Sequence, residues 1–308
     1  MSARVDIPAI VLGCGNFGGI GSAPAFFGQG ETREQAFELM DAAWAMGLDW
    51  FDTADAYGGG RSEAWIGEWV ARTGNRPRIT TKTFNPMGEG EDSGLAPARV
   101  RRQLDSSLER LGVERVDLYL AHEPDPRTPV GETLAAFTDL AATGKVAAWG
   151  LSNFGAGELR ESLDFGRPAL LQNSFSLLER GDEQDLVPLC AAEGIAFQAF
   201  GPLAGGWLTG KYRRDADLPE GSRMTLRPEP YLRYDSEDVY RALDGLGAAA
   251  AERDVSMAGL ALAWLLAHPG VTSIVVGPRT PAHLEPVREA RSLELSRDEA
   301  ETVGSLFP

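Results

Sequence analysis

The chain has 308 residues, of which 43% are hydrophobic and 24% charged, so it has enough apolar material for a large globular core. Its formal net charge of -16 argues against binding to nucleic acid, and the lack of a basic amphipathic helix or a long apolar segment argues against a membrane role. Two cysteines are too few for a disulfide framework, and the first residues do not resemble a secretory leader, so we expect a cytoplasmic protein. The sequence carries no signal for an oligomeric state.

Short apolar runs alternate along the chain with amphipathic segments of helical period. The apolar runs predict eight strands, at residues 7–12, 48–53, 79–83, 116–121, 146–151, 169–173, 195–200 and 272–276. Helices are predicted at residues 32–46, 62–72, 97–111, 129–143, 156–165, 183–193, 237–253, 256–268 and 281–307. A long irregular segment rich in Gly, Pro and Arg, residues 202–235, follows the seventh strand.

Hydroxyl residues stand at the start of two predicted helices. Thr32 and Ser62 are placed where a side-chain oxygen can accept a hydrogen bond from a free backbone N–H. Glu63 favours the positive end of the second of these helices. We therefore expect Thr32 and Ser62 to act as N-caps.

The eight predicted strands are short and almost wholly apolar, which is typical of parallel strands that are buried on both faces. Each strand is followed by a helix, and no Pro/Ser-rich linker divides the chain. The alternation predicts a single (β/α)8 TIM barrel domain over residues 1–308, with long loops at the C-terminal face of the strands, rather than an open doubly wound sheet. In such barrels the chemistry lies at the C-terminal ends of the strands.

Four chemically active side chains follow the ends of three consecutive strands. Asp52 lies at the end of the second strand and Tyr57 follows it, Lys82 lies at the end of the third, and His122 follows the fourth. A phenol is a weak acid near neutral pH, but an adjacent lysine cation stabilises the phenolate and lowers the phenol pKa. A carboxylate supplies the counter-ion that a buried lysine needs, and a histidine beside the phenol can orient a carbonyl oxygen. Together the four groups form a proton-transfer device.

Each of the four residues also has a structural interpretation when taken singly. Asp52 can cap a turn, Tyr57 can be a loop aromatic residue, and His122 can be a satisfied structural histidine. Lys82 is the least ordinary of them, because lysine is rarely buried without a partner. Convergence at one barrel mouth favours a catalytic role, since independent structural residues have no reason to share that location.

Several segments resemble the aldo-keto reductase family, in the branch that includes bacterial enzymes and potassium-channel β-subunits. Residues 52–58 read Asp-Thr-Ala-Asp-Ala-Tyr-Gly, residues 60–63 read Gly-Arg-Ser-Glu, and residues 150–154 read Gly-Leu-Ser-Asn-Phe. The resemblance extends from the first strand to the eighth. It implies that the four groups described above are the family's catalytic tetrad.

The resemblance also implies a set of contacts with a nicotinamide cofactor. Ser152, Asn153 and Gln172 match residues that bind the carboxamide, and amide and hydroxyl groups suit it because it both donates and accepts hydrogen bonds. Phe200 matches the aromatic residue that stacks on the nicotinamide ring, and Gly201 replaces a serine that is usual in the family. The remaining matches, to the loop that crosses the pyrophosphate and to the adenosine end, are Pro202, Leu203, Gly210, Lys211, Gly277, Arg279 and His283.

The choice between the two nicotinamide cofactors depends on Arg279. The resemblance matches it to a residue that contacts the 2′-phosphate, and a guanidinium fork suits a phosphate better than a hydroxyl. We therefore expect NADP(H). His283 and Val287 depart from the family, which usually has Gln and Asn at these positions.

Two other motifs are assigned no cofactor or metal. Residues 13–18 spell Gly-x-Gly-x-x-Gly after the first strand, but a dinucleotide-binding fold needs a helix to open there, and the next helix is expected only near residue 32. We interpret this segment as a flexible loop that forms one substrate wall. We expect no metal at His122, Glu123 and Asp125, because the other two histidines lie far along the chain.

The leading hypothesis is an NADP(H)-dependent oxidoreductase that reduces a small aldehyde or ketone to an alcohol, or the reverse, with Tyr57 as the general acid or base. Two alternatives stay open. One is a Schiff-base aldolase that uses Lys82 as its nucleophile. The other, implied by the channel-subunit branch, is a nucleotide-binding redox-sensing regulatory subunit with little turnover.

Overall fold

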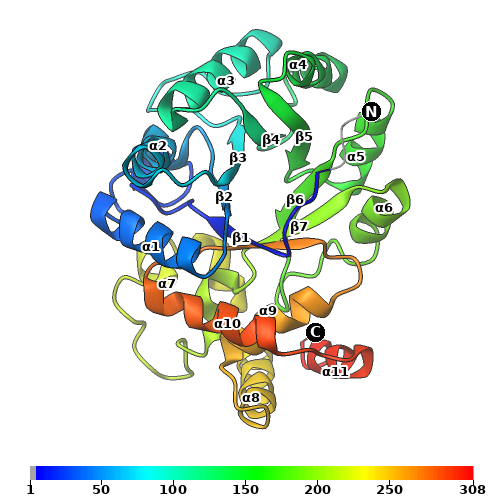
Figure 1. Cartoon of the computed structure of the whole chain (residues 1–308). Helices are drawn as coiled ribbons and strands as arrows, with labels where there is room; N and C mark the ends of the chain where they lie inside the picture. Colours follow the sequence, from blue (N-terminus) through cyan, green and yellow to red (C-terminus); the bar gives the residue numbers. More distant parts are fainter. Residues whose placement is uncertain (1–4, 308) are drawn as a thin grey trace.

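The computed structural model describes residues 5–307, and its centre is a closed parallel barrel in which β1 to β8 are paired in chain order and β8 returns to β1 (Figure 1). The strands are β1 (Ile10–Gly13), β2 (Trp50–Asp52), β3 (Arg78–Thr83), β4 (Val116–Ala121), β5 (Val146–Ser152), β6 (Leu170–Ser174), β7 (Ala196–Phe200) and β8 (Ser273–Val276). Each predicted strand overlaps an observed one, so the predicted (β/α)8 barrel is confirmed.

Helices surround this barrel as an outer ring, apart from the four-residue α7, which lies in the long segment that follows β7 (Figure 1). They are α1 (Arg33–Ala45), α2 (Arg61–Thr73), α3 (Pro97–Leu111), α4 (Val130–Ala142), α5 (Ala156–Leu163), α6 (Leu186–Glu193), α7 (Arg223–Leu226), α8 (Glu237–Ala251), α9 (Met257–Ala267), α10 (Glu285–Ser292) and α11 (Arg297–Gly304). Among residues 5–307, none of the helices is long and apolar enough to cross a membrane.

Two segments differ from their predicted form. The irregular segment 202–235 contains three short helices, η3 (Ala204–Thr209), α7 and η4 (Glu229–Tyr234). The last helical region is divided into η5 (Pro281–Leu284), α10 and α11. The division has a local cause, because Ser296 and Glu299 form a capping box that starts a new helix after the chain has left α10.

The two expected N-caps have different outcomes. Thr32 does cap α1, since its hydroxyl accepts from the Gln35 N–H at 3.3 Å and the Gln35 side chain accepts from the Thr32 N–H at 2.9 Å. The prediction for Ser62 is wrong: α2 begins at Arg61, directly after Gly60. The Ser62 hydroxyl is buried and lies 3.0 Å from the Cys14 carbonyl oxygen, so it joins the helix to the barrel instead of capping it.

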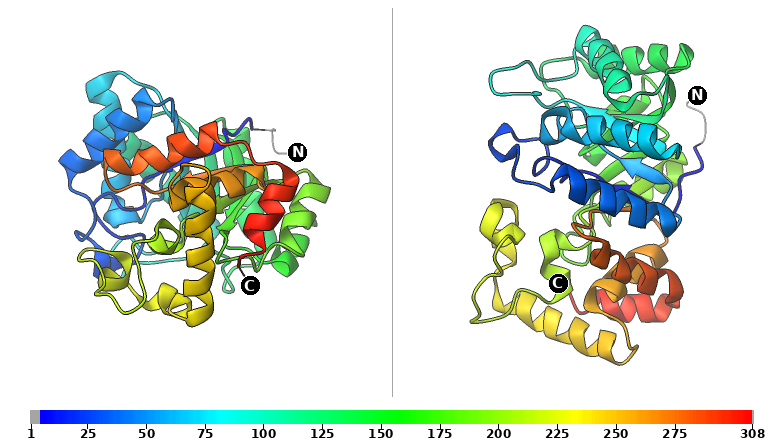
Figure 2. Two further views of the ribbon diagram at one scale, coloured as in Figure 1. Left: turned by 90° about the horizontal axis from the view of Figure 1, so that it is seen from below. Right: turned by 60° about the vertical axis from the view of Figure 1, so that its left-hand side comes forward.

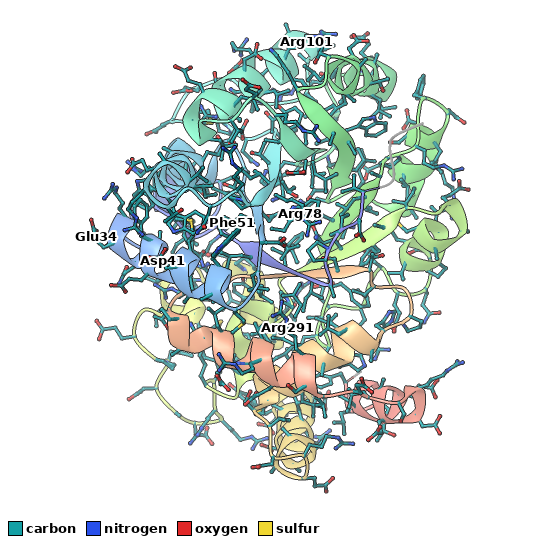
Figure 3. The ribbon with its side chains drawn as sticks, in the orientation of Figure 1. Glu34, Asp41, Phe51, Arg78, Arg101 and Arg291 are labelled. Carbon is teal, nitrogen blue, oxygen red and sulfur yellow. The ribbon has the colours of Figure 1, made fainter. Side chains whose placement is uncertain are left out.

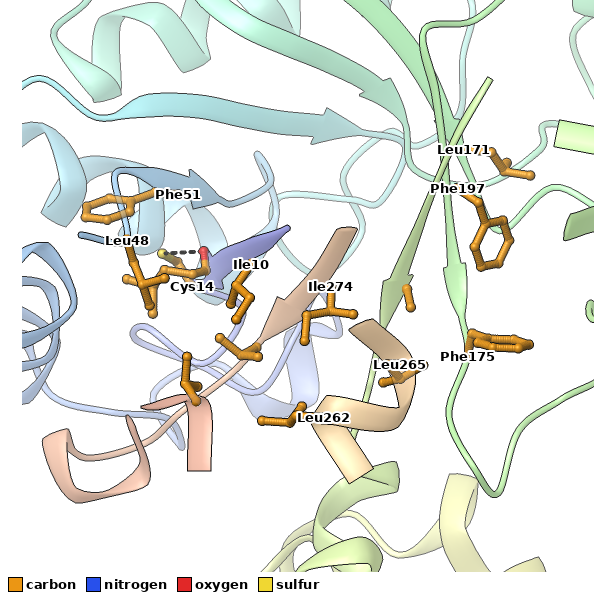
Figure 4. Packing of buried hydrophobic residues seen from close by; sticks show 14 of the residues in the cluster. Ile10, Cys14, Leu48, Phe51, Leu171, Phe175, Phe197, Leu262, Leu265 and Ile274 are labelled. Carbon is orange, nitrogen blue, oxygen red and sulfur yellow. Dashed lines mark hydrogen bonds between the residues drawn. The ribbon is translucent and has the colours of Figure 1, made fainter. Parts of the chain in front are cut away.

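The alternation of side chains along each strand separates two apolar layers. The inner layer fills the barrel and consists of Val11, Trp50, Leu118, Leu120, Ala148, Leu170 and Val275. The outer layer packs the strands against the helices: the ring of Phe51 lies 5.4 Å from that of Trp69 in α2, whereas Asp41 and Arg101 lie on exposed helix surface (Figure 3). Figure 4 shows the same layer near β7 and α9, where the Phe175 and Phe197 rings are 5.7 Å apart.

Two loops lie side by side at the mouth of the barrel: the β1 loop (residues 14–32) and the β7 loop (residues 201–236) (Figure 2). The β1 loop is the segment expected to be flexible, but its backbone is closed on itself. The Glu31 N–H donates to Asn16 O at 2.9 Å, and the Gly28 N–H donates to Gly18 O at 2.8 Å. The backbone therefore holds the side chains of this loop in fixed places over the mouth.

Candidate active site

Lys82 is the centre of the site at the barrel mouth. Its Nζ atom donates to Asp52 Oδ1 at 2.5 Å, to the Thr53 carbonyl oxygen at 2.9 Å and to the Tyr57 hydroxyl oxygen at 3.4 Å. The Lys82 side chain is 0% exposed and that of Asp52 is 4% exposed. The ammonium group therefore joins the predicted carboxylate and phenol through direct contacts, with no room for bulk water.

Strand register and a glycine turn explain this convergence. Asp52 and Lys82 take their places because every second side chain of β2 and β3 points into the barrel, and the barrel interior is narrow. Tyr57 follows on a tight turn, η2 (Tyr57–Gly60), in which Gly58 has a φ of 59°. A Cβ atom at Gly58 would stand 2.5 Å from the Phe17 carbonyl oxygen, so only glycine permits this approach to the β1 loop.

The protonation states follow from burial and charge. Burial lowers the pKa of Lys82, but the adjacent Asp52 carboxylate and the Tyr57 oxygen raise it by more, and the net pKa lies above its ordinary value. Burial raises the pKa of Tyr57, and the opposing effect of Lys82 is smaller. Lys82 lowers the pKa of Tyr57, as expected, but burial raises that pKa by more. The net pKa of Tyr57 therefore lies above its ordinary value. Tyr57 stays protonated and Lys82 stays charged at neutral pH.

His122 completes the predicted set of four. Its backbone N–H donates to the Thr83 carbonyl oxygen at 3.0 Å, and its ring meets the Tyr57 ring edge-on, with centroids 5.5 Å apart and an interplanar angle of 77°. Burial, together with the Lys82 cation, holds the pKa of His122 well below its usual value. The imidazole is therefore neutral, and it can donate a hydrogen bond to an oxygen without carrying charge.

The residues matched to the nicotinamide carboxamide lie on the neighbouring strands. The Asn153 amide nitrogen, held on a backbone with a φ of 61°, donates to the His122 carbonyl oxygen at 2.9 Å and to Ser152 Oγ at 3.2 Å. The Gln172 amide nitrogen donates to Asp52 Oδ2 and to Gln198 Oε1, each at 2.7 Å. Gln172 thus holds the second oxygen of Asp52 in place, which is a contact that the sequence analysis missed.

Gln198 extends the polar contacts across the barrel. Its amide nitrogen donates to Ser273 Oγ at 2.9 Å, and Ser273 donates to the Pro8 carbonyl oxygen at 2.8 Å. The only signal for Gln198 in the sequence is a glutamine in the middle of a predicted apolar strand. Such a residue is costly in a barrel interior unless it is hydrogen-bonded, and here it anchors the chain of contacts that ends at Asp52.

The aromatic and glycine positions at the end of β7 lie next to the same mouth. Phe200 packs against the inner apolar layer, and Gly201 follows with a φ of 65°. Pro202 and Leu203 lead into η3, and Gly210 follows the end of η3 with a φ of 74°. The β7 loop therefore begins beside the residues matched to the nicotinamide.

Cations of the β7 loop and of the β8 loop (residues 277–280) come close to one another. Burial, and then the charges of Arg279 and Arg223, hold the pKa of Lys211 below its usual value. Beyond Gly277, the Arg279 backbone N–H donates to His283 Nδ1 at 3.2 Å. The structure thus places Lys211, Arg279 and His283 near one another, and it adds Arg223 to them.

Arg279 is, however, already paired. Its Nε donates to Glu31 Oε1 at 2.7 Å, and its Nη1 donates to the Gly221 carbonyl oxygen at 2.6 Å. Nothing in the sequence marks Glu31 as a partner of this arginine, because the two residues stand 248 positions apart.

The donor set fits a nicotinamide dinucleotide. Amide and hydroxyl groups lie at the ends of β5 and β6, an aromatic ring lies at the end of β7, and cations gather on the two following loops. This order matches a planar amide, a flat ring and phosphates in sequence. In the part of the chain that the structure describes, no three His, Cys, Asp or Glu side chains are grouped so as to hold a metal ion.

A closed parallel barrel with polar and titratable side chains gathered at its mouth has the form of a barrel enzyme. The chain belongs to the aldo/keto reductase family, whose family model matches residues 9–307. It is 30% identical to an NADH-specific methylglyoxal reductase of Escherichia coli (strain K12), over 96% of this chain and 94% of the relative. It is 33% identical to a probable voltage-gated potassium channel subunit beta of Oryza sativa subsp. japonica, over 82% of this chain and 80% of the relative.

A solved structure agrees with this assignment. The glycerol dehydrogenase of Gluconobacter oxydans superposes with a TM-score of 0.84 at 27% identity, and the match covers 98% of this chain and 93% of that one. The chain is thus an oxidoreductase of a family that uses nicotinamide cofactors and acts on small-molecule carbonyl compounds.

Proposed function

We propose that the protein is an NADP(H)-dependent reductase of aldehydes or ketones, carried by one domain over residues 1–308, with Tyr57 as the proton donor. The observation that carries the proposal is the position of the Lys82 ammonium, between the buried Asp52 carboxylate and the Tyr57 oxygen. A charged lysine in this place stabilises a phenolate, which is the species that Tyr57 becomes when it gives up its proton.

Each of the four side chains has a distinct part in this reaction. The bound nicotinamide supplies hydride to the carbonyl carbon, or accepts it in the reverse direction. Tyr57 gives its proton to the substrate oxygen, and Lys82 stabilises the resulting phenolate. Asp52 keeps Lys82 charged and in position, and neutral His122 donates a hydrogen bond toward the same oxygen.

The preference for NADP(H) is supported by the cations of the β7 and β8 loops. Lys211, Arg223 and Arg279 are close enough to affect one another's pKa, and among these three cations and the Glu31 carboxylate that pairs with Arg279 the positive charges exceed the negative by two. A net positive site attracts the doubly charged 2′-phosphate, which NADPH carries and NADH lacks. A cytoplasmic location remains a prediction.

The aldolase alternative is less well supported by the geometry. A Schiff base forms from a neutral amine, whereas the pKa of Lys82 is raised by Asp52 and its Nζ donates three hydrogen bonds. Borohydride trapping with a carbonyl substrate tests this point, because only a Schiff base leaves a reduced covalent adduct.

The regulatory alternative takes its support from the channel-subunit relative. It predicts tight nucleotide retention and very slow turnover. Steady-state kinetics with excess NADPH and a panel of aldehydes, using Tyr57→Phe as the control, separate the two functions. A reductase turns over repeatedly and loses its rate in Tyr57→Phe, whereas equal and very slow rates in both proteins would favour the regulatory function.

A further inference from the structure

Glu31 is a buried carboxylate of the β1 loop that faces the cations of the other two loops. It is 3% exposed, and its Oε1 atom accepts from Arg279 Nε at 2.7 Å. Within residues 5–307, its Oε2 atom is buried without a hydrogen-bond partner. Burial raises the pKa of Glu31, and the Arg279 and Arg223 cations oppose this rise. Burying a carboxylate with one oxygen lacking a hydrogen bond lowers the stability of the fold. We therefore look for a functional role of Glu31 rather than a stabilising one.

The cations around Glu31 come from different loops and depend on one another. Arg279, on the β8 loop, also donates to the Gly221 carbonyl oxygen of the β7 loop at 2.6 Å. Arg223, on the β7 loop, donates to the Asn16 side chain of the β1 loop. Figure 2 shows the β1 and β7 loops on one side of the barrel. The Glu31–Arg279 pair therefore lies where three loops meet.

This pairing changes what Arg279 offers to a phosphate. A guanidinium binds a phosphate best when it presents two parallel N–H groups. Two Arg279 nitrogens, Nε and Nη1, already donate to Glu31 and Gly221. A phosphate that reaches Arg279 thus finds part of the fork engaged and a carboxylate of the same sign beside it. A ribose 2′-hydroxyl, which is uncharged, meets no such repulsion.

We propose that Glu31 is a specificity-determining residue that weakens the recognition of the 2′-phosphate by Arg279, so that the protein accepts both NADPH and NADH. The inference rests on the proposed function, since it takes Arg279 as the residue that faces the 2′-phosphate. Lys211 and Arg223 keep the site positive, and NADPH remains the tighter ligand. The Glu31 carboxylate reduces the preference without reversing it.

The test is a measurement of Kd for NADPH and for NADH by tryptophan quenching in the full chain, without substrate. Glu31→Gln keeps the shape and an acceptor oxygen but removes the charge. We expect it to tighten NADPH binding about fivefold to tenfold, the scale of about 1 kcal/mol, while NADH binding changes less than about twofold. Glu34→Gln is the matched control: it removes the same charge from an exposed position three residues away and leaves both Kd values unchanged.

Three results would overturn the inference alone: weaker NADPH binding by Glu31→Gln, an equal change for both nucleotides, or an equal effect of Glu34→Gln. The wild-type protein supplies a measurement that does not depend on the folding of a variant. We expect its two Kd values to lie within about tenfold of each other, and a preference for NADPH of about a hundredfold or more would contradict the role of Glu31. Binding of neither nucleotide by the wild type would instead refute the proposed function.

Discussion

The substitution Lys82→Met tests whether Lys82 and Asp52 form a buried ion pair in which each charge compensates the other. Methionine has a similar length but no charge, so Asp52 would remain buried with the Gln172 amide as its remaining side-chain partner. Breaking a buried pair by removing one partner costs about 3–5 kcal/mol, because the other charge is left uncompensated. We expect the free energy of unfolding to fall by that amount.

The double variant Asp52→Asn/Lys82→Met separates the charge from the packing. With the carboxylate gone, no buried charge is left, and the Gln172 contact can be kept by the asparagine side chain. The loss should shrink to about 1–3 kcal/mol, the cost of imperfectly satisfied polar groups. The double variant is therefore expected to be more stable than Lys82→Met alone, a sign of coupling between the two positions.

Urea unfolding followed by tryptophan fluorescence measures these differences, and Lys145→Met is the matched control. Lys145 and Asp105 form an ion pair of the same 2.5 Å length, but their side chains are 44% and 58% exposed. An exposed pair contributes about 0–1 kcal/mol, so this control should be nearly as stable as the wild type. Equal losses for Lys82→Met and Lys145→Met, or a double variant that is less stable than Lys82→Met, would refute the argument.

Three further predictions concern other parts of the molecule. Tyr57→Phe should lower kcat/KM for carbonyl reduction by about 10²–10⁴ with the Kd for NADPH unchanged, and wild-type turnover in this variant would exclude Tyr57 as the proton donor. The pKa of buried Asp55 is raised to about 7, so the stability that comes with its proton is complete below about pH 4 and is lost as the pH rises toward 7. Asp55→Asn should remove about 4 kcal/mol of this pH dependence, as urea unfolding at pH 4 and pH 8 would show, and an unchanged slope would contradict the assignment. Gly67→Ala would place a Cβ atom 2.4 Å from the Arg110 carbonyl oxygen between α2 and α3, and we expect a loss of about 1–3 kcal/mol in thermal or urea unfolding. Gly157→Ala in α5 has open space around the new atom and should be neutral or stabilising, so equal losses in the two variants would refute the packing argument.

The order of strands and helices was determined by the sequence itself. Apolar runs buried on both faces read directly as parallel strands, and the barrel follows from their number and alternation. The same period of two places Asp52 and Lys82 on the inward face, and His122 follows one position beyond β4. Local signals also sufficed for Thr32, because a capping box lies within four consecutive residues.

What the tertiary structure alone decided are the contacts between residues far apart in the chain. Ser62 carries the local signal of an N-cap, but the packing of α2 against the barrel turned its hydroxyl toward Cys14. The direction of the Tyr57 pKa depends on burial at the closed mouth, which outweighs the nearby lysine. The pairing of Arg279 with Glu31 arises because three loops meet above the strands, and no local pattern records which loops become neighbours. The charge balance around the proposed cofactor site is therefore a property of the folded barrel, because the charged residues are brought together only when the strands close.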